Sequence, residues 1–144
     1  MFNFLNFNNY KYKFYTTFAR LFKPEIRIEL DFCTLHFFDG YVISYINEGE
    51  IVTFDKSSII TKTAVEFYGT SKFVYITNRV NSYSVDPSVY LDISKIKTLV
   101  GFAIVSKDYT AKSNAEIEKL FLNKPLEVFD VIEDAIAWAK SVLD

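Results

Sequence analysis

The spacing of apolar residues changes several times along this chain, and these changes restrict its fold more than any other feature. Short apolar or alternating runs recur between segments whose apolar residues have helical spacing. Strands and helices that alternate in this way form a largely parallel sheet joined by right-handed crossovers. Because two strands joined by a tight turn come first in the chain, the sheet must also contain antiparallel strands. The pattern predicts an α/β fold with a mixed, largely parallel sheet, an N-terminal β-hairpin and about four helices.

The hairpin precedes every predicted helix. Residues 25–32 alternate between apolar and polar side chains, as a half-buried strand does. Residues 34–38 and 41–46 are rich in aromatic and β-branched residues. Asp39 and Gly40 stand between these two runs, a pair preferred by type I′ turns because both positions need a positive φ. We therefore expect two antiparallel strands joined by a type I′ turn.

The first two helices carry recognisable start and stop signals. Thr53 is a plausible N-cap, the following residues have helical apolar spacing, and Gly69 is placed to end that helix. Asp86 followed by Pro87 predicts a second, short helix that reaches about Ser94.

The last two helices are predicted from capping motifs. Ser113 and Glu116 form a capping box, and Pro125 breaks the helix that follows it. Asp130 with Glu133 is expected to open the final helix. Apolar runs between the helices predict buried strands at residues 73–77, 99–105 and 126–129.

The first 24 residues differ in composition from the rest of the chain. They carry four basic residues and no acidic one, whereas the remaining 120 carry 12 basic and 18 acidic residues. We therefore divide the chain into an N-terminal extension, residues 1–24, and a folded domain, residues 25–144. The extension is interpreted as a segment that docks on the domain, docks on a second copy or stays loose. A mis-called start is a further alternative.

A membrane-surface helix is another interpretation of the extension. Its apolar face would comprise Phe14, Phe18, Leu21 and Phe22, with basic residues beside it. Asn and Lys interrupt the apolar runs, so neither a secretory signal nor a spanning helix of roughly 20 apolar residues is indicated. We expect a cytoplasmic protein whose membrane contact, if made, is through residues 1–24.

Composition excludes several classes of function. One Cys and one His exclude a disulfide framework and a Cys/His zinc site. A formal net charge of −2 argues against nucleic-acid binding. The four glycines are isolated, so no phosphate-binding loop is present. We expect no metal and no cofactor.

Residues suited to catalysis have structural interpretations. His36 and Cys33 stand alone in or near a predicted strand. The acidic residues Glu116 and Glu118 are expected in a first helical turn, where the helix dipole accounts for them. The chain is therefore expected not to be an enzyme.

One polar segment, residues 78–86, is the candidate site. It leaves a predicted strand and enters a helix start, the place where open α/β sheets bind ligands. Its candidate contacts for a ligand or partner are Asn78, Arg79, Asn81, Tyr83 and Asp86, and its candidate phosphoacceptors are Ser82 and Ser84. The alternative is turn chemistry, in which Asn, Ser and Asp bond their own backbone.

Two longer segments carry a resemblance to a known family. FVYITNRVNSYSVDP (73–87) and SNAEIEKLFLNKPLEVFDVIEDAIAWAK (113–140) resemble small stand-alone STAS-like proteins of flavobacteria, and the element order is similar to the SpoIIAA-like fold. In STAS antagonists a kinase phosphorylates a Ser within an acidic-Ser-Ser/Thr-Gly signature. The loop here lacks that signature, and Ser82 or Ser84 falls near the phosphosite by position.

Two functions follow from these observations. The first is a non-enzymatic, STAS-like regulatory or protein-interaction domain in signalling, with an unidentified protein partner and control by phosphorylation in the loop 78–86. The alternative is a small-ligand or lipid-binding module with peripheral membrane contact through residues 1–24. A homodimer is also expected, because the aromatic-rich extension would otherwise expose apolar surface.

Overall fold

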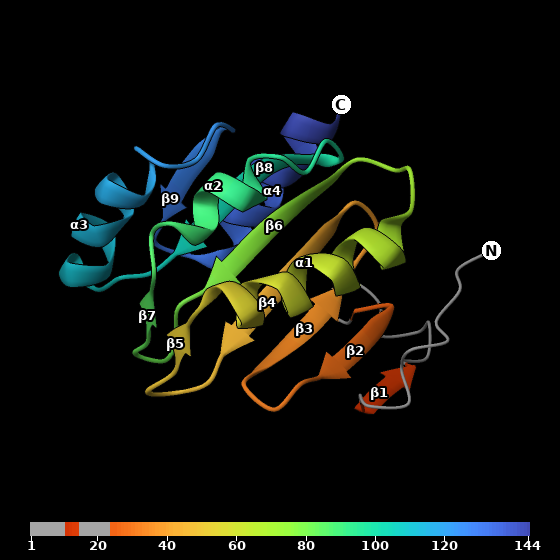
Figure 1. Ribbon diagram of the computed structural model, residues 1–144. Helices are drawn as coiled ribbons and strands as arrows, with labels where there is room; N and C mark the ends of the chain where they lie inside the picture. The colour runs from red at the N-terminus through yellow and green to blue at the C-terminus, as the bar shows by residue number, and fades with distance from the viewer. Residues whose placement is uncertain (1–10, 15–23) are drawn as a thin grey trace.

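The computed structural model describes residues 11–14 and 24–144 and shows a sheet flanked by helices on both faces (Figure 1). The main sheet has seven strands in the order β1-β2-β3-β4-β6-β8-β9. Their bounds are β1 (Lys11–Phe14), β2 (Ile26–Glu29), β3 (Cys33–Phe37), β4 (Tyr41–Ile46), β6 (Phe73–Asn78), β8 (Leu99–Val105) and β9 (Leu126–Phe129). A separate ribbon pairs β5 (Ile51–Val52) with β7 (Ser84–Val85). The helices are α1 (Phe54–Tyr68), α2 (Val89–Ile93), α3 (Tyr109–Glu118) and α4 (Ile132–Leu143).

The sheet is mixed, as predicted. β1 to β4 are antiparallel neighbours, and β4, β6, β8 and β9 are parallel neighbours. Each parallel connection passes through a helix, because parallel strands need a long crossover. The α/β class and the four helices predicted from the sequence are thus confirmed.

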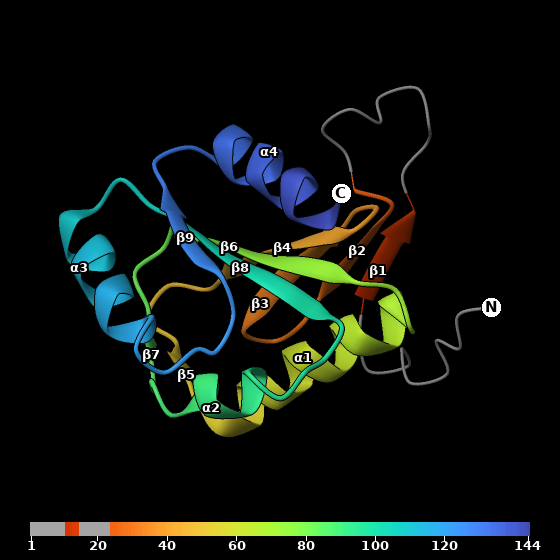
Figure 2. The ribbon, with the colours of Figure 1, turned by 90° about the horizontal axis from the view of Figure 1, so that it is seen from above.

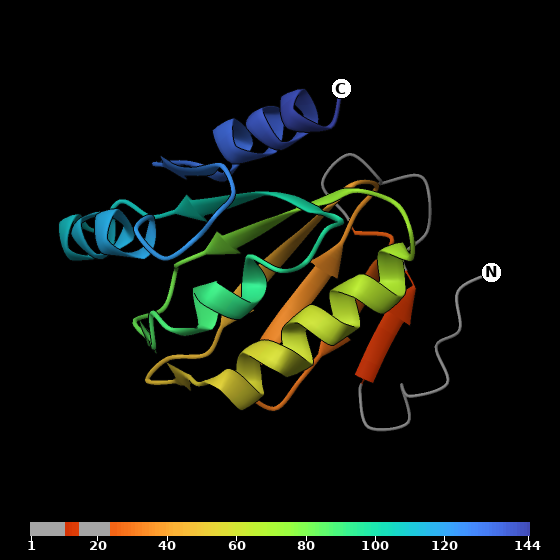
Figure 3. The ribbon, with the colours of Figure 1, turned by 45° about the horizontal axis from the view of Figure 1, so that its top comes forward.

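Helices cover the sheet unequally. α1 and α2 lie on one face and α4 lies on the other, over β6, β8 and β9 (Figures 2 and 3). Alternation along β6 serves both layers, since Phe73 and Tyr75 face the α1 side whereas Val74 and Ile76 face α4. α3 lies at the end of the sheet, beside β9 and near β7.

The hairpin between β3 and β4 is confirmed, but its turn is not type I′. Gly40 has a φ of 82°, and no non-glycine among the described residues has a positive φ, so Asp39 does not meet the type I′ requirement. A positive φ at the third turn position alone is the requirement of a type II turn. A Cβ on Gly40 would lie 2.7 Å from Cδ1 of Leu143, so glycine is also needed for the approach of α4.

The third and fourth helices begin elsewhere than the capping motifs predicted. The Asp108 carboxylate accepts from the Thr110 N–H (3.1 Å) and caps α3, which places Ser113 inside the helix. The N-cap of α4 is Val131, and the Asp130 carboxylate instead binds the Lys112 ammonium. Glu118 consequently lies in the last turn of α3, not in a first turn.

The short helix after Pro87 begins two residues further along the chain than predicted. The Asp86 carboxylate accepts from the Ser88 N–H (3.0 Å) and Oγ–H (2.9 Å), and α2 then begins at Val89. The ribbon of β5 and β7 was not predicted, because two residues per strand leave no periodic pattern to detect.

Part of the extension belongs to the sheet. β1 pairs with β2 at the sheet edge, and Pro24 is buried. The surface helix predicted from Phe18, Leu21 and Phe22 lies outside the described residues, whereas Phe14 ends β1. Within the described ranges, no helix combines the length and hydrophobicity needed to span a bilayer.

Candidate functional site

The segment predicted as the site borders a hollow at the surface. This hollow, called the cleft below, lies between β7 and α3 and has a volume of about 200 Å³. It is lined by Arg79, Tyr83, Ser84, Val85, Pro87, Asn114, Ile117 and Glu118. Its lining residues come from the chain that follows the carboxyl end of β6 and from α3.

A buried ion pair forms one wall of the cleft. Nη2 of Arg79 donates to Oε1 (3.0 Å) and Oε2 (2.7 Å) of Glu118, and only 8% and 7% of the two side chains are exposed. Nε of Arg79 donates to the Tyr83 hydroxyl (3.1 Å), which also shares a hydrogen bond with Thr77 Oγ1 (2.6 Å). The Tyr90 hydroxyl donates to Oε2 of Glu118. These residues form one connected network, in which the Glu118 carboxylate balances the positive charge of Arg79.

Burial and neighbouring charges shift the pKa of Arg79 and of the two phenols in this network. Burial opposes the charge on Arg79, but Tyr83 and the Glu118 carboxylate outweigh it and raise the pKa of Arg79. Burial, and then the negative charge of Glu118, raise the pKa of Tyr90 well above its usual value. Burial also raises the pKa of Tyr83, although Arg79 opposes this. At neutral pH both phenols are therefore protonated.

Glu118 occupies an unfavourable helical position. It is the last residue of α3, where the negative end of the helix dipole disfavours a carboxylate. Its buried position removes it from water as well, which costs several kcal/mol for an ion unless a partner compensates. Arg79 supplies that compensation, so each member of the pair offsets the free-energy cost of burying the other's charge.

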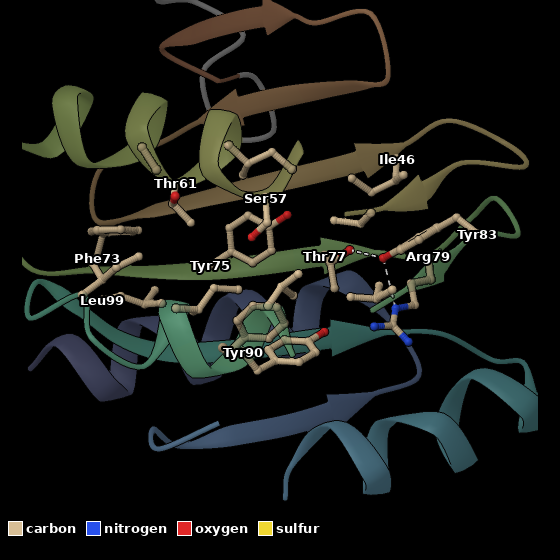
Figure 4. A pocket seen from close by; sticks show the side chains of 18 residues that line it. Ile46, Ser57, Thr61, Phe73, Tyr75, Thr77, Arg79, Tyr83, Tyr90 and Leu99 are labelled. Atoms are coloured by element: carbon tan, nitrogen blue, oxygen red, sulfur yellow. Dashed lines mark hydrogen bonds between the residues drawn. The ribbon is translucent and has the colours of Figure 1, made fainter. Parts of the chain in front are cut away.

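A second hollow lies behind the network. This apolar hollow lies between the sheet and helices α1 and α2, and Arg79 and Tyr83 stand at one end of it (Figure 4). Its cavity volume is about 50 Å³, roughly a third of the ~150 Å³ of an engineered cavity that binds benzene. Arg79, Tyr83 and Val85 line both hollows, so the network separates the apolar hollow from the cleft.

Several predicted site residues serve the local backbone instead. Nδ2 of Asn81 donates to the Ile46 carbonyl (3.0 Å), which ties the loop to β4. Asp86 forms the turn before α2, and its hydrogen bonds to Ser88 lower its pKa. Asn78 is the last residue of β6 and is half-buried. For Asp86 the structure thus shows the turn chemistry that was the alternative interpretation, whereas Asn81 bonds the backbone of a strand distant in sequence.

The two candidate phosphoacceptors are both exposed. The Ser82 N–H donates to Oε2 of Glu48 (2.7 Å), and the Ser84 N–H donates to the Glu50 carbonyl (3.0 Å). Ser84 lines the cleft beside Arg79, whereas Ser82 lies outside it. The structure therefore brings Arg79, Tyr83 and Ser84 together and leaves Asn78, Asn81, Ser82 and Asp86 outside the cleft lining.

Sequence reasoning missed the partners of Arg79. Glu118 was assigned to a first helical turn, and Tyr90 was not singled out. A signal for Glu118 existed, since it is spaced three and four residues from the buried Ala115 and Leu122 on α3 and just beyond it. A carboxylate in such a buried stripe needs a cation, and Arg79 was the cation already singled out in the loop.

His36 and Cys33 lie away from the cleft. Burial, with a smaller effect of Arg27, lowers the pKa of His36 to about 4, and its ring packs against Tyr45. Burial, with a smaller effect of Glu50, raises the pKa of Cys33 to about 12, so the thiol is unreactive at neutral pH. Within residues 11–14 and 24–144 no three His, Cys, Asp or Glu side chains gather as a metal site would require.

Comparisons with protein-family models, with curated proteins and with solved structures find no match to this chain. The resemblance to STAS-like proteins therefore stays a prediction from the sequence.

Proposed function

We propose that this chain is a non-enzymatic, STAS-like regulatory domain that binds a protein partner. The partner-binding surface, called the interaction face below, comprises β5, the loop 78–86, α2 and α3. The observation that carries this proposal is the exposure of large apolar side chains on these segments. The exposed fractions are 58% for Ile51, 67% for Val80, 54% for Leu91 and 51% for Ile117.

Contacts within the fold bring several of these side chains to one end of the molecule. The Cα of Ile51 is paired with that of Ser84 in the ribbon, and Ser84 and Ile117 line the same cleft. β5, β7 and α3 lie together at the end where the parallel strands finish (Figures 1 and 2). Apolar side chains grouped around a hollow with a polar rim are typical of protein-binding surfaces.

The interaction face is held in place by the fold. Asn81 bonds β4, the Gly49 N–H donates to the Ser82 carbonyl (2.7 Å), and the Arg79–Glu118 pair ties the loop to α3. A surface ordered before binding loses less conformational entropy when a partner docks. These hydrogen bonds and this ion pair favour recognition of a folded partner by a preformed surface.

Phosphorylation in the loop is the proposed control. Ser82 and Ser84 expose their side chains on this face. A phosphate on Ser82 would lie near the Glu48 carboxylate that accepts from its backbone, and like-charge repulsion would open that contact. A phosphate on Ser84 would add negative charge at the cleft. Either modification changes the surface offered to a partner.

A pull-down from the native host tests the interaction face. We expect Ile51→Asp and Ile117→Asp to remove a specifically enriched partner, because each places a charge within the proposed apolar contact. The matched control is Ile59→Asp, since Ile59 is exposed to 36% on α1, outside the face. Recovery of the same partner with all three variants contradicts the proposal. Ser82→Asp and Ser84→Asp in the same assay test the control by phosphorylation.

The small-ligand or lipid-binding alternative would use the apolar hollow as its binding site. At about 50 Å³ the hollow has no room for an acyl chain without rearrangement of α1 or α2. Native mass spectrometry of the protein from its own host tests this alternative, because a retained lipid would add its mass to the intact protein. Membrane contact through residues 1–24 and a homodimer stay predictions.

A further inference from the structure

The Arg79–Glu118 pair leaves hydrogen-bonding capacity unused. A guanidinium has five N–H donors. Nη2 of Arg79 donates to both Glu118 oxygens and Nε donates to Tyr83, but Nη1 makes no hydrogen bond among the described residues. A cationic edge with two N–H donors is therefore available on a residue that lines the cleft.

The Glu118 carboxylate also has an open acceptor position. Oε2 accepts from both Arg79 and Tyr90, whereas Oε1 accepts from Arg79 alone. A carboxylate has about four acceptor positions in all, two on each oxygen. Nη1 shares its carbon with Nη2, which lies 3.0 Å from Oε1, so the free donors and the free acceptor are neighbours.

The rest of the cleft is divided between apolar and polar groups. Val85, Pro87 and Ile117 supply apolar surface, and Asn114 and Ser84 supply an amide and a hydroxyl. The volume of about 200 Å³ exceeds the ~150 Å³ of an engineered cavity that binds benzene. A branched aliphatic or aromatic group can therefore be accommodated beside the ion pair.

The charge of the site selects the class of ligand. The cleft wall contains one positive and one negative group and has no net charge. Glu118 would repel a simple anion bound at Nη1, and Arg79 would repel a simple cation bound at Oε1. A zwitterion satisfies both groups, and an α-amino acid carries its ammonium and its carboxylate on the same carbon atom.

We propose that the cleft binds a free α-amino acid with an apolar side chain. Its carboxylate accepts from Nη1 of Arg79, its ammonium donates to Oε1 of Glu118, and its side chain packs against Val85, Pro87 and Ile117. Arg79 and Glu118 keep their mutual hydrogen bonds throughout. This ligand site goes beyond the proposed protein interaction and does not depend on it.

Three probes that share an isobutyl group test the proposal. L-Leucine carries both charges, 4-methylpentanoate only the carboxylate and 3-methylbutylamine only the ammonium. We expect L-leucine to raise the melting temperature of the full chain with the logarithm of its concentration and to give saturable heat in calorimetry. The other two compounds should give neither effect. Equal responses to L-leucine and 4-methylpentanoate would overturn the proposal. It would also be overturned if neither L-leucine nor L-phenylalanine gave a response, since the cleft would then hold only water.

Two variants locate the binding site. Arg79→Met together with Glu118→Gln removes both charges and leaves an amide oxygen to accept from Tyr90, and it should abolish the response to L-leucine. Ile117→Trp leaves the network intact and fills the cleft, so it should abolish the response even where the double variant folds poorly. The control is Leu120→Trp, since Leu120 is exposed to 81% and does not line the cleft. Retention of L-leucine binding by Ile117→Trp would contradict the assignment.

Discussion

At the scale of single residues, the most consequential feature is a charge pair with almost no contact with water. Arg79 and Glu118 expose only 8% and 7% of their side chains. Desolvation makes such a pair a weak source of net stability, yet loss of one member leaves a buried charge without compensation. The pair therefore imposes a requirement for both residues, which ties the loop after β6 to the end of α3.

A double-mutant cycle measures this requirement. Arg79→Leu and Glu118→Leu should each lower the free energy of unfolding by about 3–5 kcal/mol, because each leaves one buried ion unpaired. The double variant should lose less than the sum of the two, and urea denaturation gives all three values. As a control, Glu116→Leu breaks the exposed pair with Lys119 (3.5 Å) and should cost less than about 1 kcal/mol. Additive single effects would show that the two charges do not interact.

At the scale of elements, the position of α3 decides which side chains reach the cleft. The Asp108 cap starts the helix earlier than Ser113 would, so Asn114, Ile117 and Glu118 lie in the second half of α3 and not in its first turns. Asn114 and Glu118 are four residues apart and therefore share one helical face, which is turned to the cleft. The start of this helix thus positions one wall of the candidate site.

Capping variants test where α3 begins. Asp108→Ala should lower the free energy of unfolding by about 1 kcal/mol, because the carboxylate accepts the Thr110 N–H. Ser113→Ala should be neutral or slightly stabilising, since Ser113 is exposed within the helix and alanine is the better helix former. Thermal and urea unfolding compare the two variants. A larger loss with Ser113→Ala would place the start of the helix at the motif seen in the sequence.

At the scale of the whole molecule, the turn between β3 and β4 meets the last helix, α4. Gly40 in the hairpin turn lies against Leu143 at the end of α4, although most of the chain separates them. Gly101 on β8 makes a similar approach to Trp138, with 3.0 Å from a Cβ position to Cη2. α4 can approach this closely because glycines stand at these two places, one in the hairpin turn and one on β8.

Two matched glycine variants test this packing. Gly40 and Gly49 have φ angles of 82° and 79°, so alanine meets similar backbone strain at both. A Cβ at Gly40 also clashes with Leu143, whereas a Cβ at Gly49 has no heavy atom of the described residues within 4 Å beyond its two chain neighbours. Gly40→Ala should therefore lower the melting temperature more than Gly49→Ala, and Leu143→Ala should reduce the difference. Equal losses from the two glycine variants would contradict the contact.

The sequence by itself determined the class and order of the fold. Apolar or β-branched runs located β4, β8 and β9, and helical spacing of apolar residues located α1, because a buried element shows its apolar residues in the local sequence. The polar loop between a strand end and a helix start also placed Arg79, Tyr83 and Ser84 in a candidate site. Only the tertiary structure joined Arg79 to Glu118 and Tyr90 and formed the ribbon of β5 and β7. These features depend on contacts between residues far apart in the chain, and local spacing does not identify the partner in such a contact.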